Sequence, residues 1–237
     1  GTRLAWRRGN LHEALRVLAP AIAAALIATL IVLLVATPRA LAAAASIGLA
    51  IWVISASVVD FVRLKRSGAT LRAGAFASAI AHAGLGFTLI GVAGTTAWRS
   101  EAVEVLKPGQ QLNIAGYSLR FDGVERTAAQ GYFANRATIE VMSGGRTIAT
   151  MYPQVRQYPA EGQATTETAI RTNGFEDLYL ALGDERGNGG WVVRAYVNPL
   201  APFIWFGGAI MALGGALSLF ARLRARRVVP AAVAVSQ

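Results

Sequence analysis

One histidine, His82, lies inside a long apolar stretch, residues 73–91, in which no other side chain is ionisable. On an α-helix that rises about 1.5 Å per residue, His82 would lie about 15 Å beyond Arg72, roughly half the thickness of a bilayer's hydrocarbon core. An ionisable group at that depth is costly in free energy, so it usually faces the interior of a helix bundle and has a function. Such a histidine could ligate a metal or haem iron, relay protons, or hydrogen-bond to a neighbouring helix.

The neighbours of His82 on the helix surface are small. Ser78 and Gly86 are each four residues from it and therefore share its face, and Gly84 adds room beside the ring. Small residues permit close approach of another helix or of a flat macrocycle, and a neutral imidazole can ligate haem iron. A histidine that is hydrogen-bonded across the bundle fits the same pattern, so both interpretations stay open. A proton relay is less well supported, because the apolar runs carry no Asp, Glu or Lys at that depth.

The other histidine, His12, lies in a basic, mildly amphipathic segment, residues 3–16, that precedes the first apolar run. Such a segment is typical of a cytoplasmic membrane surface. His12 would therefore differ from His82 by several helix turns in depth, and we do not expect it to ligate the same iron. Cysteine is absent, which excludes disulfides, thiolate-bound zinc and thiol exchange within this chain. Any redox chemistry must come from a cofactor.

The elements that position His82 are four apolar runs, at residues 18–36, 40–59, 73–97 and 199–220. The chain is 54% hydrophobic and 15% charged, with a mean hydropathy of +0.43. These values predict an integral membrane protein with four transmembrane helices. A cleaved signal peptide explains the first run less well, because its apolar core should be only about 7–15 residues long. Since Gly1 is not an initiator, we expect a fragment of a longer protein.

The formal net charge of +10 is concentrated beside these runs. Basic residues gather in the amino-terminal segment, in residues 63–72 and in residues 222–227, whereas the short loop around Arg39 has one charge. The positive-inside rule therefore predicts cytoplasmic termini and an external segment 98–198, which in a bacterium means the periplasm. That segment is close to electrically neutral, so we do not expect nucleic-acid binding.

Segment 98–198 has the pattern of an antiparallel β domain. Alternating β-forming residues occur at 117–124, 137–142, 147–152 and 191–197. Glycine-rich turn signals separate them, and Ser143-Gly144-Gly145 is typical of a hairpin tip. The predicted fold class is thus a membrane α+β protein with a β barrel or sandwich inserted between helices three and four. Its predicted parts are a cytoplasmic amphipathic segment with three helices (1–97), the β domain (98–198), a fourth helix (199–221) and a basic tail (222–237).

Weaker signals lie outside the histidine-bearing run. Gly207-Gly208 and Gly214-Gly215 repeat at a spacing of seven residues and predict a smooth stripe for helix packing. Residues 153–159 and 165–170 fit either an exposed contact surface or a loop followed by a strand. No Ser-His-Asp arrangement, carboxylate pair or phosphate-binding loop is recognisable in the sequence.

Several short motifs, taken in order, resemble the carboxy-terminal region of the CcmF family. This family provides the membrane subunit of the cytochrome c maturation haem lyase. The resemblance covers about residues 3–227. It rests on Ala81-His82-Ala83-Gly84, Pro153-Gln154-Val155-Arg156-Gln157-Tyr158, Thr165-Thr166-Glu167, Asp177-Leu178-Tyr179, Asn198-Pro199-Leu200 and Ile204-Trp205-Phe206-Gly207-Gly208.

The resemblance implies that His82 is an axial ligand of a transmembrane haem b, which the family is thought to use to reduce the incoming haem. The family holds this haem with two membrane histidines, and His82 matches the second. The first histidine is absent here, as is the family's tryptophan-rich segment with its two flanking histidines. The haem would thus be shared with a missing amino-terminal CcmF portion or subunit, and we expect no activity from this part alone.

The further partners that the resemblance implies are the haem chaperone CcmE, the thiol-redox and apocytochrome-binding subunits of the lyase, and apocytochrome c. The reacting cysteines would belong to the apocytochrome. An alternative is a structural or interaction membrane protein that displays a periplasmic β module and binds no cofactor. A transporter has less support, because the apolar runs lack a substrate-sized polar set and paired broken helices.

Overall fold

The computed structural model describes residues 11–35, 41–66, 73–129, 131–160 and 162–227. It contains two compact units, one of helices and one, Trp98–Pro202, of strands. Each unit is described below by itself. The short loop around Arg39 and residues 228–237 of the predicted basic tail lie outside the described residues, as does most of the amphipathic segment.

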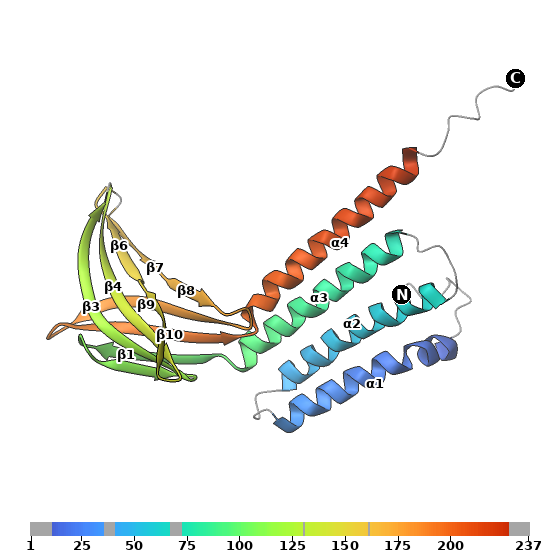
Figure 1. Cartoon of the computed structure of the whole chain (residues 1–237), viewed down its shortest axis with the longest axis horizontal. Helices are drawn as coiled ribbons and strands as arrows, with labels where there is room; N and C mark the ends of the chain where they lie inside the picture. Colours follow the sequence, from blue (N-terminus) through green and yellow to red (C-terminus); the bar gives the residue numbers. More distant parts are fainter. Residues whose placement is uncertain (1–10, 36–40, 67–72, 130, 161, 228–237) are drawn as a thin grey trace, which may run out of the picture. The chain divides into compact units, whose positions relative to one another are not determined.

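Among the described residues, four helices are long and apolar enough to cross a membrane, as the sequence predicts. Their spans are Leu15–Leu34, Leu41–Arg63, Gly74–Ala97 and Ala201–Arg224. The helices themselves are α1 (Leu11–Val35), α2 (Leu41–Arg66), α3 (Ala73–Ala97) and α4 (Ala201–Arg227) (Figure 1). Two boundaries differ from expectation. Residues 11–16 continue directly into the first span, and the basic residues 222–227 belong to the fourth helix and not to a separate tail.

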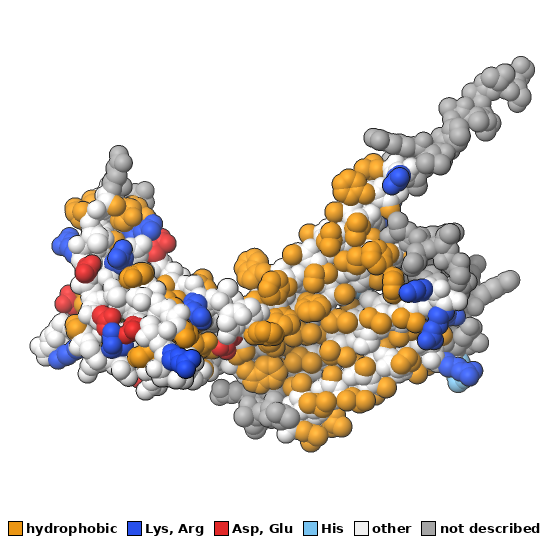
Figure 2. Space-filling view, in the orientation of Figure 1, with side chains coloured by type: hydrophobic (Ala, Val, Ile, Leu, Met, Phe, Trp, Pro, Cys, Tyr) orange, Lys and Arg blue, Asp and Glu red, His pale blue; other side chains and the backbone are white. Residues whose placement is uncertain are grey.

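The helices lie side by side in chain order, in a single layer (Figure 1). Glycines allow the close contacts between neighbours: a Cβ on Gly48 of α2 would collide with Thr29 of α1. Many large apolar side chains remain exposed on the layer, among them Leu26 at 65% and Leu34 at 76%. Figure 2 shows hydrophobic side chains over the helices and Lys and Arg side chains gathered toward one end. Lipid or further protein must cover both faces of such a layer.

The β domain is a sandwich of two antiparallel sheets (Figure 1). The four-stranded sheet has the order β1-β10-β9-β8, and the six-stranded sheet has the order β2-β3-β4-β6-β7 with β5 also paired to β4. The first sheet contains β1 (Ser100–Leu106), β8 (Ala169–Thr172), β9 (Glu176–Arg186) and β10 (Gly190–Pro199). The second contains β2 (Gln111–Ile114), β3 (Tyr117–Ala129), β4 (Tyr132–Ser143), β5 (Arg146–Met151), β6 (Gln154–Tyr158) and β7 (Gln163–Glu167).

One hydrophobic core joins the two sheets. Its fully buried side chains include Phe121 and Ile139 from the six-stranded sheet and Leu180 and Val193 from the four-stranded sheet. Each such side chain contributes about 1.5–3 kcal/mol by leaving water. All four predicted strands are present, and the predicted hairpin tip is confirmed, since Ser143 pairs with Arg146. Gly144 and Gly145 have φ of 58° and 76°, which a two-residue hairpin turn of this kind requires.

Candidate functional site

His82 lies on α3, nearer to the end of the span that follows the basic loop. Along the helix it is about 12 Å from Gly74 and about 22 Å from Ala97. These positions are the two ends of the predicted span. The imidazole therefore lies within the apolar part of the span, as the sequence predicts, although closer to one third of its length than to one half.

A hydrogen bond within α3 fixes the chemistry of the ring. Nδ1 of His82 lies 2.7 Å from the backbone carbonyl oxygen of Ser78. A carbonyl only accepts hydrogen bonds, so Nδ1 must carry the proton and donate it. In the neutral imidazole this leaves Nε2 with the free lone pair, which is the nitrogen that can bind a metal. The hydroxyl oxygen of Ser78 lies farther from the same Nδ1, at 3.3 Å, and is therefore the weaker of the two contacts.

His82 and Ser78 are exposed on the helix layer. The neighbouring residue Leu85 on that side of α3 is 40% exposed. The sequence places the imidazole in a bundle interior, but the described helices form a layer and leave this face of α3 uncovered. An imidazole that faces hydrocarbon is costly in free energy.

Neighbouring helices fill the space next to the glycines beside His82. A Cβ on Gly84 would lie 2.6 Å from the carbonyl oxygen of Gly207 on α4, and a Cβ on Gly86 would collide with Ile54 on α2. Of the two interpretations given to these small residues, close helix approach is confirmed. The expected room beside the ring for a flat macrocycle is not found at these positions, because other helices fill it.

The packing of α4 on α3 uses one glycine of each predicted pair. A Cβ on Gly207 would meet the backbone of Gly84 at 2.5 Å, and a Cβ on Gly214 would meet the backbone nitrogen of Ala81 at 2.7 Å. Gly208 and Gly215 have nothing within 4 Å. The stripe prediction is therefore confirmed for Gly207 and Gly214. Because Ala81 adjoins His82, this α3–α4 seam holds the backbone from which the imidazole projects.

Within the described part of the chain, no group of three or more His, Cys, Asp and Glu side chains could hold a metal ion. His82 can thus supply one ligand. His12 is exposed near the beginning of α1, before the span that starts at Leu15, where the sequence places it. Helix α2 packs between α1 and α3. A second axial ligand from His12 is not compatible with this arrangement.

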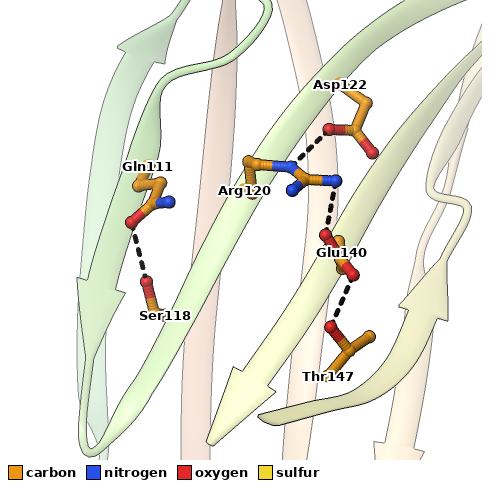
Figure 3. Close-up of polar contacts among 6 residues, drawn as sticks. All are labelled: Gln111, Ser118, Arg120, Asp122, Glu140 and Thr147. Atoms are coloured by element: carbon orange, nitrogen blue, oxygen red, sulfur yellow. Dashed lines mark hydrogen bonds and ion pairs between the residues drawn. The ribbon is translucent and has the colours of Figure 1, made fainter. Parts of the chain in front are cut away.

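The β domain carries a polar network on its six-stranded sheet (Figure 3). Arg120 donates to Asp122 at 2.8 Å and to Glu140 at 2.5 Å, and Thr147 donates to the same Glu140. The hydrogen bond to Asp122 is the main cause that raises the pKa of Arg120, so its guanidinium stays charged. The network links β3, β4 and β5 across the sheet. Its contacts join neighbouring strands of this sheet.

Segments 153–159 and 165–170 contain strand β6, which is mostly half-buried, and parts of β7 and β8, which are more exposed. Arg156 on β6 lies 4.8 Å above the ring of Tyr132 and 3.6 Å from the carboxylate of Glu167. The Tyr132 and Tyr158 rings are 5.5 Å apart. Such arginine–aromatic contacts contribute about 0.5–1 kcal/mol at exposed sites. They join side chains of β4, β6 and β7 on this sheet.

The sequence pattern does not single out the turn between β8 and β9. Its residue Phe175 is 70% exposed, the largest value among the exposed large hydrophobic residues of the described β domain. The signal in the sequence is the run Thr172-Asn173-Gly174-Phe175, in which turn-forming residues precede an aromatic residue.

Residues 97–199 match the family model described as the CcmF C-terminal beta-sandwich. The cytochrome c-type biogenesis protein ccl1 of Rhodobacter capsulatus is 36% identical over 225 residues, covering 92% of this chain and 34% of the relative. CycK of Bradyrhizobium diazoefficiens is 37% identical, covering 92% of the chain and 35% of the relative. CcmF of Pseudomonas aeruginosa is 34% identical over 73% of the chain and 27% of the relative.

A solved structure described as cytochrome c heme lyase CcmF is similar, with a TM-score of 0.74. The alignment covers 91% of this chain and 36% of the solved chain, at 23% sequence identity, and the similarity supports the fold. The chain thus spans about a third of the length of the first two curated relatives.

Proposed function

Because the chain belongs to the CcmF family of cytochrome c-type biogenesis proteins and matches its C-terminal region, we propose that it supports covalent attachment of haem to apocytochrome c. In this proposal it is the C-terminal part of a CcmF-type haem lyase subunit. His82 is one axial ligand of a membrane haem b. The other two thirds of the relatives have no counterpart in the chain, and the lyase activity requires them.

One observation carries the haem proposal: the hydrogen bond from Nδ1 of His82 to the Ser78 carbonyl, at 2.7 Å. Histidines that bind metals almost always donate their other N–H to a carbonyl, carboxylate or water, which fixes the tautomer and the ring orientation. Here the N–H donor of His82 and the carbonyl acceptor of Ser78 lie within about one turn of the same helix. Nε2 is therefore the ligand atom, and its position does not depend on the side chain of another helix.

The uncovered face of α3 favours a haem shared with an N-terminal CcmF portion or subunit. A haem is a large apolar macrocycle, and His82 is exposed beside the apolar side chain of Leu85. Because His82 is the one histidine inside the described spans, the second axial ligand is proposed to come from the partner portion. When bound, the haem supplies one-electron chemistry, which in this proposal reduces the iron of the haem to be attached.

In this proposal, the chain's own residues hold the haem through His82 and orient the imidazole that binds it. Ser78 fixes the imidazole tautomer, and the α3–α4 seam fixes the helix backbone beside it. The reacting thiols are proposed to belong to the apocytochrome, since this chain has no cysteine of its own to contribute. The haem chaperone CcmE and the thiol-redox and apocytochrome-binding subunits are proposed to act on the side of the membrane that carries the β domain.

The distribution of basic residues supports an orientation in a bacterial inner membrane. The last turn of α2 contains Arg63, Lys65 and Arg66, and α4 ends with a further basic cluster at residues 222–227. Both clusters lie beside ends of spans that the positive-inside rule assigns to the cytoplasm. The termini are then cytoplasmic and the β domain is periplasmic.

Co-expression of this chain with the N-terminal CcmF portion tests the proposal. We expect the purified complex to show a haem Soret band that His82→Ala abolishes. His12→Ala is the matched control, because it removes the other histidine at the membrane surface and should leave the band unchanged. If the complex assembles and its Soret band is the same with His82→Ala, the ligand assignment is wrong. A complex that never contains haem would favour the structural or interaction protein instead.

A further inference from the structure

The four-stranded sheet has one end at which the chain enters and leaves the β domain. Strand β1 begins at Ser100, shortly after α3 ends at Ala97, and Ser100 pairs with Val197 near the end of β10. Strand β10 ends at Pro199, which pairs with Glu176, and α4 begins at Ala201. The turn between β8 and β9 lies at this same end.

This turn is tied to the residue that precedes the fourth span. The backbone N–H of Leu200 donates to the carbonyl oxygen of Phe175 at 2.6 Å. The span itself starts at Ala201. By connectivity alone, the backbone of Phe175 therefore lies one hydrogen bond away from the point at which the chain enters the membrane.

The turn is held in one conformation by its own polar groups. The side-chain oxygen of Asn173 accepts from the backbone N–H of Phe175 and of Glu176, both at 2.9 Å. Gly174 has φ of 89°, a conformation that favours glycine, and its N–H donates to the hydroxyl of Thr172 at 3.1 Å. A turn so constrained loses little conformational entropy when its tip binds something.

A carboxylate that adjoins the tip is hydrogen-bonded within the domain. Oε1 of Glu176 accepts from the hydroxyl of Tyr117 at 2.7 Å and from the side-chain amide of Asn173 at 3.3 Å. The residues of the tip, Asn173 to Phe175, carry no charge. The side chain of Phe175 is 70% exposed, and Ile170 on the adjoining strand β8 is 61% exposed.

We propose that the β8–β9 turn inserts Phe175 into the headgroup region of the lipid bilayer where α4 enters the membrane. Aromatic residues are enriched at this level of membrane proteins, because an apolar ring gains by leaving water there. The insertion gives the β domain an attachment to the membrane besides its two chain connections. A lipid occupant is favoured because the depth of Phe175 follows from Leu200, which adjoins the span.

Because the natural chain has no cysteine, a nitroxide spin label at Phe175→Cys can report its surroundings without background labelling. The full chain is reconstituted in vesicles of phosphatidylethanolamine and phosphatidylglycerol. Collision rates are then compared for oxygen, which concentrates in lipid, and for a water-soluble nickel chelate. We expect the label at residue 175 to collide severalfold more with oxygen than with the nickel chelate.

Phe133→Cys is the matched control, because Phe133 is also an exposed phenylalanine, at 43%. Phe133 lies on β4 and pairs with Ala128 on β3. Ala128 is about 35 Å along β3 from Tyr117, the residue whose hydroxyl bonds to Glu176 beside the turn. The label at residue 133 should favour the nickel chelate. The proposal is overturned if the label at 175 behaves like the label at 133, or if it is shielded from both reagents, as in a protein contact. Should Phe175→Cys fail to fold, a label at Ile170→Cys carries the same test with the same two readouts.

Discussion

At the residue scale, the geometry of His82 depends on a backbone group and not on another side chain. The sequence predicts that Ser78 and His82 share a face, and the structure places the Ser78 carbonyl 2.7 Å from Nδ1. The sequence cannot identify that acceptor, because any residue at position 78 would offer the same carbonyl. It also cannot predict that the ring is exposed, since that depends on how the helices associate.

Ser78→Ala tests which group of Ser78 orients the ring. Loss of a partner that orients a metal-binding histidine typically costs about 10–100-fold in affinity. Because the carbonyl remains in Ser78→Ala, we expect the haem content of the co-expressed complex to fall by far less than that. Haem is measured by its pyridine complex in purified protein. A loss as large as that of His82→Ala would show that the hydroxyl, 3.3 Å from Nδ1, is the essential partner.

Tyr117 offers a second residue-scale prediction, in the β domain. Burial, followed by the hydrogen bond to Glu176, raises the pKa of Tyr117 above its ordinary value of 10.0. The folded state therefore binds more protons than the unfolded state just above pH 10, and the stability that this group contributes is lost as the pH rises through its folded pKa. Tyr117→Phe should lower the unfolding free energy by about 1 kcal/mol near pH 8.

The same variant should lose less stability than the wild type between about pH 9 and pH 11, because it has no phenol to ionise. Urea titrations of the chain in detergent, followed by tryptophan fluorescence, measure both effects. Parallel decline of the two proteins over this pH interval would contradict the assignment.

At the element scale, the α3–α4 seam positions the helix that bears His82. Gly207 packs against the backbone of Gly84, whereas its neighbour Gly208 has nothing within 4 Å. The sequence predicts a glycine stripe on this helix but not which glycine of each pair packs. That distinction depends on the rotation of α4 about its axis, which a nearly uniform apolar sequence does not encode.

Gly207→Ala and Gly208→Ala are a matched pair for this seam. A methyl group at 207 would lie 2.5 Å from backbone atoms of α3, which cannot move unless the helices separate. We expect Gly207→Ala to destabilise the helix unit by about 1–3 kcal/mol. Gly208→Ala should be neutral or slightly stabilising, because alanine is favoured over glycine within helices. Thermal unfolding in detergent compares the two, and equal effects would argue against the seam.

The strands divide into those that the sequence predicts and those that it does not. Strands β3, β4, β5 and β10 contain alternating residues such as Leu119 and Phe121, which reach the core. Strand β7, Gln163–Glu167, is polar and almost wholly exposed, so it lacks the alternation that marks a half-buried strand. Strand β8 has four residues, too few to establish a period. Their pairing in the sheet, and not their own composition, makes them strands.

At the scale of the whole molecule, the helix unit is a single layer with uncovered apolar faces, while the β domain has a closed core of its own. The difference agrees with the comparisons, in which the chain covers 34% of the relative from R. capsulatus. A family model for the β sandwich matches residues 97–199. The sequence predicts the four spans, but it could not show which face of α3 is left uncovered, because that depends on how the helices associate.

Leu85→Cys tests whether the N-terminal CcmF portion covers this face. Leu85 is 40% exposed on the His82 side of α3, and the chain has no other cysteine. We expect a membrane-soluble maleimide to label Leu85→Cys readily in the chain alone and about tenfold more slowly in the co-expressed complex, because burial at a protein interface excludes the reagent. Equal labelling rates would place the partner portion elsewhere.

The central claim is that Nε2 of His82 binds haem iron, and chemical rescue of His82→Gly in the co-expressed complex tests it most directly. Removal of the imidazole leaves a space in which free imidazole can take its place as the axial ligand. The account predicts that His82→Gly loses the low-spin haem spectrum and that added imidazole restores it, with no such response in His12→Gly. A low-spin spectrum that persists in His82→Gly without imidazole would contradict the account.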